Sequence, residues 1–129
     1  MNKEQFYINF ETALKDFKED FEKETKNFSD DKVNKILESM FVFFNVKEQC
    51  IEFEFCSGSY GLDIFYPSPQ PYNSICVNEQ FLFSDDYSNY INKAIQDGIR
   101  YFEDEIDADN VSEVFEKDAQ ETLNILKQL

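Results

Sequence analysis

Apolar residues recur at three- and four-residue steps through the first forty residues, and charged residues fill the positions between them. The first stripe comprises Phe6, Phe10, Ala13, Phe17 and Phe21. Such spacing predicts an amphipathic helix that buries one side. A polar break at residues 27–31 follows, in which Ser29 or Asp30 is placed to cap a second, shorter helix.

From residue 41 the apolar period changes from helical spacing to two. The segments FVFFNV, CIEFEF, LDIFY and SICVNEQFLF therefore predict four strands. In the second segment the alternation assigns Phe53 to a buried face, and Glu52 and Glu54 to a solvated one. All three prolines fall within residues 67–71, which predicts an extended loop before the last strand. Because the other connections are short, we expect an antiparallel meander with one face covered.

Helical spacing returns in the last third of the chain. Residues 84–86 are polar and predict the start of a long helix, and Gly98 lies on its apolar side, where another backbone can come close. Asn110 and Glu113 have the spacing of a capping box for a final helix, whose apolar side carries Val111, Val114, Phe115, Ala119, Leu123 and Leu126. Residues 1–129 are thus expected to form a single α+β domain with N-terminal helices, a four-stranded mainly antiparallel sheet and two C-terminal helices.

Composition indicates a chain that folds and stays away from membranes. Of its 129 residues 42% are hydrophobic, including 15 Phe, which is too apolar for a disordered acidic tail. It shows neither an apolar leader nor a long apolar run, and its three cysteines are typical of reduced, buried thiols. We therefore expect a cytoplasmic protein without a membrane segment.

Acidic residues are far more numerous than basic ones and are unevenly distributed. The chain has 27 acidic and 12 basic residues, a formal net charge of −15. Residues 1–40 hold ten acids and seven lysines, net −3, whereas residues 84–121 hold twelve acids and three basic residues, net −9. A protein this acidic is repelled by nucleic acids and by anionic membranes, and it attracts basic proteins.

The concentration of charge predicts a partner-binding surface on the C-terminal helices. The acidic residues assigned to it are Asp85, Asp86, Asp97, Glu103, Asp104, Glu105, Asp107, Asp109 and Glu113. Tyr60 and Tyr72 lie near turns and are added as candidate anchors, since tyrosine is enriched in interfaces. The alternative is that the acids form a solvated helix end that keeps an aromatic-rich protein soluble, and that the tyrosines edge the core.

The sequence lacks the usual residue patterns for catalysis or metal binding. The chain has no histidine, and Arg100 is its one arginine, so neither a histidine base nor an arginine clamp for phosphate is present. Residues 105–116 have partial calcium-loop spacing, but Asn110 stands where such a loop requires glycine. We expect a protein that is not an enzyme and needs no cofactor or metal.

In size, acidity and lack of catalytic residues, the whole chain resembles the small immunity proteins that bacteria carry against their own toxins, including those of contact-dependent growth inhibition and other polymorphic toxin systems. The resemblance is one of general character. It implies an inhibitor that binds a basic nuclease toxin and occludes its active or substrate-binding site. The alternative left open is a nucleic-acid mimic that blocks a defence nuclease, as anti-restriction and anti-CRISPR proteins do, and a purely structural subunit is the third possibility.

Overall fold

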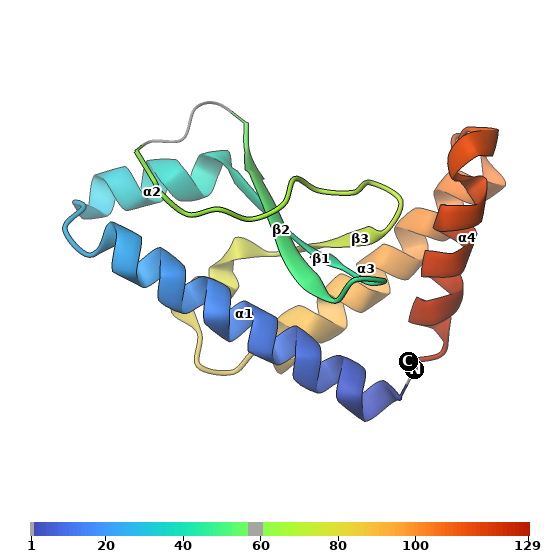
Figure 1. The fold of residues 1–129 in the computed structure, drawn as a ribbon, viewed down its shortest axis with the longest axis horizontal. Helices are drawn as coiled ribbons and strands as arrows, with labels where there is room; N and C mark the ends of the chain where they lie inside the picture. Colours follow the sequence, from blue (N-terminus) through green and yellow to red (C-terminus); the bar gives the residue numbers. More distant parts are fainter. Residues whose placement is uncertain (1, 57–60) are drawn as a thin grey trace.

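A computed structural model describes residues 2–56 and 61–129, which form an α+β fold (Figure 1). Its elements are α1 (Lys3–Thr25), α2 (Asp30–Ser39), β1 (Met40–Asn45), β2 (Cys50–Phe55), β3 (Ser74–Val77), the 3₁₀ helix η1 (Glu79–Phe83), α3 (Ser88–Asp107) and α4 (Glu113–Lys127). The predicted fold class and the two pairs of helices are confirmed. None of the helices in the described part is long and apolar enough to cross a bilayer.

The sheet of the described residues has three antiparallel strands in the order β2-β1-β3, so the predicted four-stranded meander is wrong. The predicted third strand, LDIFY, forms no strand. The loop that follows it runs beside β2, where Phe53 N donates to Pro67 O at 3.1 Å and Gln70 N donates to Glu52 Oε1 at 3.1 Å. The prolines at positions 67, 69 and 71 follow this segment, and because a residue without an N–H cannot donate to a ladder, the chain beyond LDIFY cannot extend a regular strand along β2.

The predicted fourth strand ends early, at Val77, where the chain turns into η1. Asn78 starts this turn by accepting a hydrogen bond from Gln80 N at 2.9 Å. The successive residues Phe81 and Leu82 of this 3₁₀ helix are both buried.

Aromatic packing joins α1 to one face of the sheet. Phe44 of β1 stacks on Phe10 with ring centroids 4.0 Å apart, and Phe6 meets the same ring edge-on at 5.6 Å. Leu14 is fully buried in this stripe, while Ala13 is only partly buried. The predicted cap of α2 is confirmed, since Ser29 Oγ accepts a hydrogen bond from Lys32 N at 3.2 Å.

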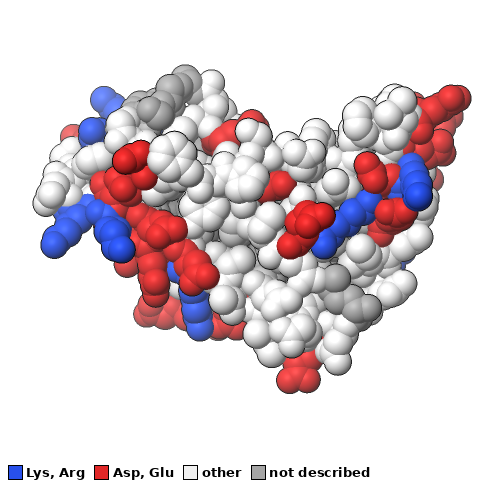
Figure 2. Space-filling view, viewed as in Figure 1, with Lys and Arg blue, Asp and Glu red and all other residues white. Residues whose placement is uncertain are grey.

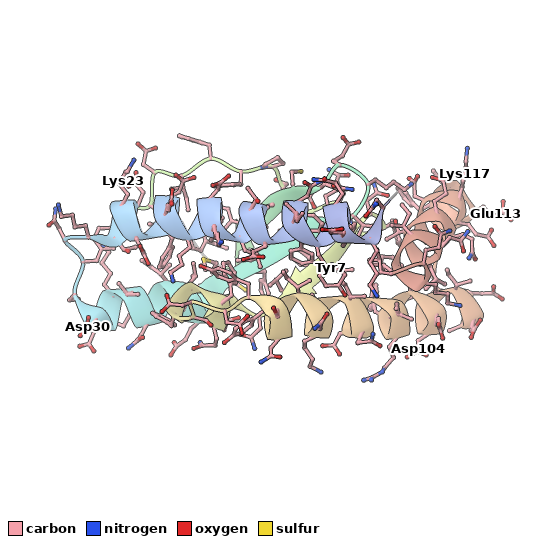
Figure 3. The ribbon with its side chains drawn as sticks, turned by 90° about the horizontal axis from the view of Figure 1, so that it is seen from below. Tyr7, Lys23, Asp30, Asp104, Glu113 and Lys117 are labelled. Atoms are coloured by element: carbon pink, nitrogen blue, oxygen red, sulfur yellow. The ribbon has the colours of Figure 1, made fainter. Side chains whose placement is uncertain are left out.

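The long helix α3 runs beside α1 and packs against β3 (Figures 1 and 3). Tyr7 lies between the two helices and donates its hydroxyl hydrogen to Asn92 Oδ1 at 2.9 Å. At Gly98, a Cβ atom would lie 2.5 Å from Cγ2 of Ile75 in β3. A close approach is therefore found at this glycine, but the neighbour is the side chain of Ile75, so the predicted approach of a backbone is wrong.

Both C-terminal helices begin later than the sequence predicts. The first starts at Ser88, whose N–H is bound by Asp86 Oδ1 at 3.0 Å, and not at residues 84–86. The second has Ser112 as its N-terminal flanking residue, so the predicted capping box of Asn110 is wrong. Because α4 leaves the core at its first turn, Val114 is 80% exposed and Phe115 43% exposed, contrary to the predicted apolar stripe.

The second face of the sheet is not uniformly solvated. Glu52 is only 2% exposed, contrary to the alternation in β2, whereas Glu54 is exposed as predicted. The loop before β3 covers Glu52, whose Oε1 accepts a hydrogen bond from Gln70 N at 3.1 Å. The loop before β3 therefore covers the end of this sheet face that holds Glu52. The other end of the same face, at Phe41, is not covered by the loop.

Candidate partner-binding surface

The C-terminus of α3 gathers four carboxylates, which we call the acidic end: Asp104, Glu105, Asp107 and Asp109. The chain turns sharply here, with Asn110 N donating to Glu105 O at 3.0 Å and Asp109 N to Ile106 O at 3.1 Å. These two bonds form a Schellman motif, in which Asp109 occupies the left-handed position with φ of 54°. The motif ends the helix and fixes the four carboxylates around one turn.

Helix electrostatics do not favour acids at this position. The C-terminus of a helix carries partial negative charge, which stabilises basic side chains and destabilises acidic ones. The last turn of α3 has no basic residue. In contrast, Glu113 and Glu116 lie in the first turn of α4, where the partial charge is positive. Local structure therefore accounts for Glu113 and Glu116 and gives no reason for the acidic end.

Several of the predicted surface residues are instead neutralised within the protein. Asp97 pairs with Lys93 at 2.9 Å, Glu103 with Lys127 at 3.3 Å and Asp85 with Lys18 at 3.8 Å. Within residues 2–56 and 61–129, the four carboxylates of the acidic end make no ion pair. Asp86 and Glu113 likewise make no ion pair there, so the acidic end supplies four of the six predicted acidic residues that have none.

The structure does not bring all the predicted residues together. Asp85 and Asp86 precede α3 and the acidic end terminates it, and a helix of 20 residues is about 30 Å long. Glu113 does join the acidic end, because it lines a hollow of about 420 Å³ together with Asp109 and Glu116. Among the described residues no group of three or more His, Cys, Asp or Glu side chains is placed to hold a metal ion.

The two tyrosines have different outcomes. Tyr72 is partly buried and stacks on Phe115 of α4, with ring centroids 4.8 Å apart. Its carbonyl oxygen accepts a hydrogen bond from Thr122 Oγ1 at 2.7 Å, so this residue fastens the loop before β3 to α4. Tyr60 lies outside the described residues.

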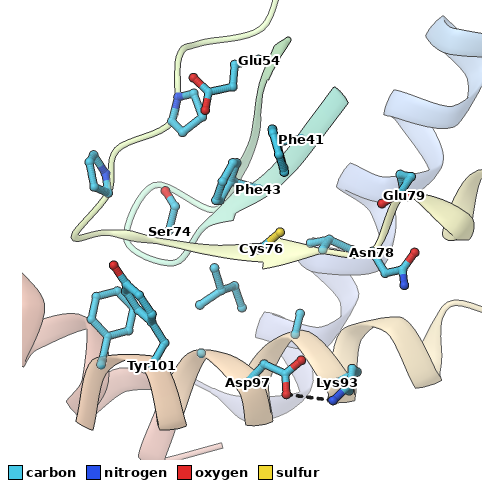
Figure 4. Close-up of a pocket in the computed structure, with 17 residues that line it drawn as sticks. Phe41, Phe43, Glu54, Ser74, Cys76, Asn78, Glu79, Lys93, Asp97 and Tyr101 are labelled. Atoms are coloured by element: carbon cyan, nitrogen blue, oxygen red, sulfur yellow. Dashed lines mark hydrogen bonds and ion pairs between the residues drawn. The ribbon is translucent and has the colours of Figure 1, made fainter. Parts of the chain in front are cut away.

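A groove that the sequence analysis missed adjoins the acidic end (Figure 4). It encloses about 800 Å³ between the open end of the sheet face, strand β3 and helix α3. Phe41, Phe43 and Cys76 line the sheet side, and Tyr101 lines the helix side. Phe41 is 43% exposed and Tyr101 50% exposed. The available signal was the run FVFFNV, whose phenylalanines occupy both faces of one strand.

The groove lies in a negative environment. Glu54, Glu79 and Asp97 line it, with Lys93 as the basic residue among the lining side chains. Partial desolvation in the groove raises the pKa of the Cys76 thiol, and the charges of Glu79 and Asp97 raise it further. Burial likewise raises the pKa of Tyr101, with a smaller contribution from Glu105. Both groups remain protonated at neutral pH, so the groove offers a binding surface and no activated nucleophile. The cysteines at positions 56 and 76 are exposed, contrary to the expectation of buried thiols.

Acidic side chains occupy separate parts of the face seen in Figure 2. One group lies on α1 and another at the meeting point of α3 and α4, with mostly uncharged surface between them. Lys47 stands among acids near α4 and bonds to Asp118 and Glu121, each at 2.8 Å. Among the described residues, carboxylates without an ion pair also lie on α1, at Glu4, Asp16 and Glu19. What distinguishes the end of α3 is that its last turn holds no basic residue.

Comparison with known proteins gives no match, whether to a family model, to a curated protein sequence or to a solved structure.

Proposed function

We propose that this protein is an acidic inhibitor that binds a basic protein partner, and specifically an immunity protein that neutralises a cognate nuclease toxin. The acidic end is the observation that carries the proposal. Its four carboxylates crowd one turn, oppose the helix dipole and have no ion pair within the described chain. Residues that destabilise a fold and make no stabilising interaction within it are typical of functional surfaces.

The proposed mechanism is occlusion. A nuclease needs a cationic groove for its substrate, and the acidic end would dock on or beside that groove and exclude nucleic acid. Complementary fields can raise association to about 10⁸–10⁹ M⁻¹s⁻¹ at low salt. The partner's basic side chains would supply the counter-charge that α3 lacks. The proposal includes neither catalysis nor a cofactor, in keeping with the absence of histidine.

The alternative function, nucleic-acid mimicry, requires a regular row of free negative charges. Duplex DNA carries one charge per about 1.7 Å of its axis. Along α3, Asp97 and Glu103 are paired with lysines, and the unpaired carboxylates gather at one end. A single concentrated patch favours one specific basic partner over a general mimic.

Co-expression with the product of the adjacent gene tests the proposal. We expect that product to be a basic protein that is toxic alone, to co-purify with this chain and to lose nuclease activity in the complex. A harmless neighbour that does not bind would contradict an immunity function. Salt-sensitive binding to several unrelated DNA-binding proteins would instead support mimicry.

A further inference from the structure

We propose that the groove beside β3 receives an extended segment of the basic partner, which pairs with the free edge of β3 and places apolar side chains against Phe41 and Phe43. This inference rests on the proposed function and adds a second contact to the acidic end. Three independent features of the described chain carry it: an unpaired strand edge, an aromatic wall and an acidic rim.

The backbone of β3 is hydrogen-bonded on one side only. Val46 N donates to Asn73 O at 2.7 Å, and the next residue pair along the ladder is Asn45–Ser74. Because bonded and non-bonded pairs alternate in an antiparallel ladder, Ser74 and Cys76 direct their N–H and C=O groups away from β1. In the part of the chain that the structure describes, only β1 pairs with β3. Such an edge is a template for an additional strand.

The aromatic wall lies directly beside this edge. Cys76 pairs in register with Phe43, and Phe41 lies two residues further along the same face of β1. All three line the groove, and Cys76 and Phe41 are exposed. An added strand has side chains that alternate in direction, so every second side chain could pack against these rings. The volume of about 800 Å³ is sufficient for several side chains.

The charges at the rim identify the kind of segment that fits. Glu54 and Glu79 line the groove and make no ion pair among the described residues, whereas Asp97 is already paired with Lys93 (Figure 4). A segment that alternates basic and apolar residues would satisfy both the carboxylates and the rings. A second copy of this chain does not fit, because it carries a net charge of −15 and would repel the same rim.

The groove is also continuous with the acidic end. Along α3, Lys93, Asp97, Tyr101 and Asp104 are spaced three or four residues apart and share one face. Tyr101 borders the groove and Asp104 belongs to the acidic end, so one helix face joins the two surfaces. A partner docked at the acidic end would therefore hold its own chain within reach of β3.

The test uses the whole protein, labelled with ¹⁵N, and the synthetic peptide acetyl-KVKFKVK-amide. We expect the amide signals of Ser74, Cys76 and Asn78 to shift on titration and the Cys76 thiol to be protected from maleimide. The equally charged peptide acetyl-KSKSKSK-amide should bind more weakly. A third peptide has the sequence acetyl-KVKFKVK-amide with N-methyl groups on the alternate residues whose N–H groups would face β3. It should also bind more weakly than the unmethylated peptide, because these residues cannot donate hydrogen bonds to β3.

Matched variants separate the groove from general electrostatic attraction. Phe41→Ser should weaken binding of the apolar peptide by at least about fivefold, as expected for an interface anchor. Phe65→Ser makes the same change at a residue that is 88% exposed and outside the groove, and should leave affinity unchanged. The peptide controls remain informative even if Phe41→Ser fails to fold.

Two results would overturn the groove proposal. One is a set of shifts confined to the acidic end, with the amides of residues 74–78 unmoved at millimolar peptide. The other is equal affinity for the apolar, serine-containing and N-methylated peptides. Neither result bears on whether the neighbouring gene product binds and is inhibited, so the proposed function would stand or fall separately.

Discussion

The carboxylate of Glu52 accepts hydrogen bonds from three neutral donors inside the protein. Asn45 Nδ2 lies at 2.9 Å and Gln70 N at 3.1 Å, and the Ser74 hydroxyl completes the set. Asn45 cannot reverse its amide freely, because its Oδ1 already accepts from Lys47 N and Glu48 N at 3.1 and 2.9 Å. Glu52 therefore fastens β2 to the strand and loop that form the closed end of the face.

We predict that Glu52→Gln lowers the free energy of unfolding by about 1–3 kcal/mol, because the new amide group would face the Asn45 amide donor to donor. Urea unfolding followed by circular dichroism measures the change. Glu54→Gln, two residues along the same strand but exposed, is the control and should stay within about 0.5 kcal/mol of the parent. Equal effects in both variants would show that the buried network contributes nothing specific.

Asp109 holds a backbone conformation that L-residues seldom adopt, with φ of 54°. We predict that Asp109→Gly stabilises the protein by roughly 0.5–1 kcal/mol. Glycine adopts this backbone conformation without a Cβ clash, and the substitution removes a negative charge that is unfavourable at a helix C-terminus. Asp109→Ala removes the same charge but keeps the clash. In thermal unfolding the glycine variant should therefore be the more stable of the two, and the reverse order would contradict the assignment of the Schellman motif.

At the scale of elements, Gly98 sets the distance between α3 and β3. We predict that Gly98→Ala destabilises the protein by about 1–3 kcal/mol through overpacking, although alanine is favoured over glycine in a helix by about 1 kcal/mol. The cause is Ile75 Cγ2, which would lie 2.5 Å from the new Cβ. A double-mutant cycle with Ile75→Ala tests this, because removal of Cγ2 should make the second change less harmful. If the stability losses of the two substitutions were additive, the clash between the new Cβ atom and Ile75 would not be the cause of the destabilisation.

Lys47 joins the turn between β1 and β2 to α4. Partial burial lowers the pKa of Lys47, but its hydrogen bonds to Asp118 and Glu121 outweigh burial and raise the pKa above its usual 10.5. The hydrogen bond from Lys47 also lowers the pKa of Glu121 below its usual 4.5. The ammonium therefore contributes stability that is lost as the pH rises above 10.5. The Glu121 carboxylate contributes stability that is lost as the pH falls below 4.5.

We predict that Lys47→Met lowers the melting temperature at neutral pH and that its difference from the parent narrows as the pH falls below 4.5. Calorimetry across the acid range measures both. Lys93→Met removes an exposed lysine from a pair within one helix and should have a smaller effect. A difference that is independent of pH would mean that Lys47 acts through packing alone.

At the scale of the whole molecule, periodicity predicted which segments are helical, but it predicted neither where the C-terminal helices begin nor how the strands pair. The stripe of α1 is confirmed because local spacing decides which side is buried. The fourth strand failed because hydrophobicity does not distinguish a strand from the 3₁₀ turn in which Phe81 and Leu82 are both buried. Strand order also depends on long-range pairing, and no local pattern reveals that β3 pairs with β1.

The candidate surface, too, could be predicted from the sequence only in part. Counting charges located the acidic end, but ion pairs such as Glu103–Lys127 at 3.3 Å join different helices and become visible only in three dimensions. The groove needs the strand order and the path of the loop before β3, because its walls come from β1, β3 and α3. The sequence offered one hint, in the two phenylalanines of β1 that point away from the core.

The association rate with the neighbouring gene product, measured by stopped flow over a range of salt, tests the central claim most directly. One variant changes the acidic end (Asp104, Glu105, Asp107 and Asp109) to the corresponding amides. The control makes the same four-charge change at exposed glutamates of α1: Glu4, Glu11, Glu19 and Glu22. We predict that the first variant associates at least about tenfold more slowly at low salt, with a shallower salt dependence, and that the control loses much less. Equal losses in the two variants, or none in the first, would contradict a docking surface at the end of α3.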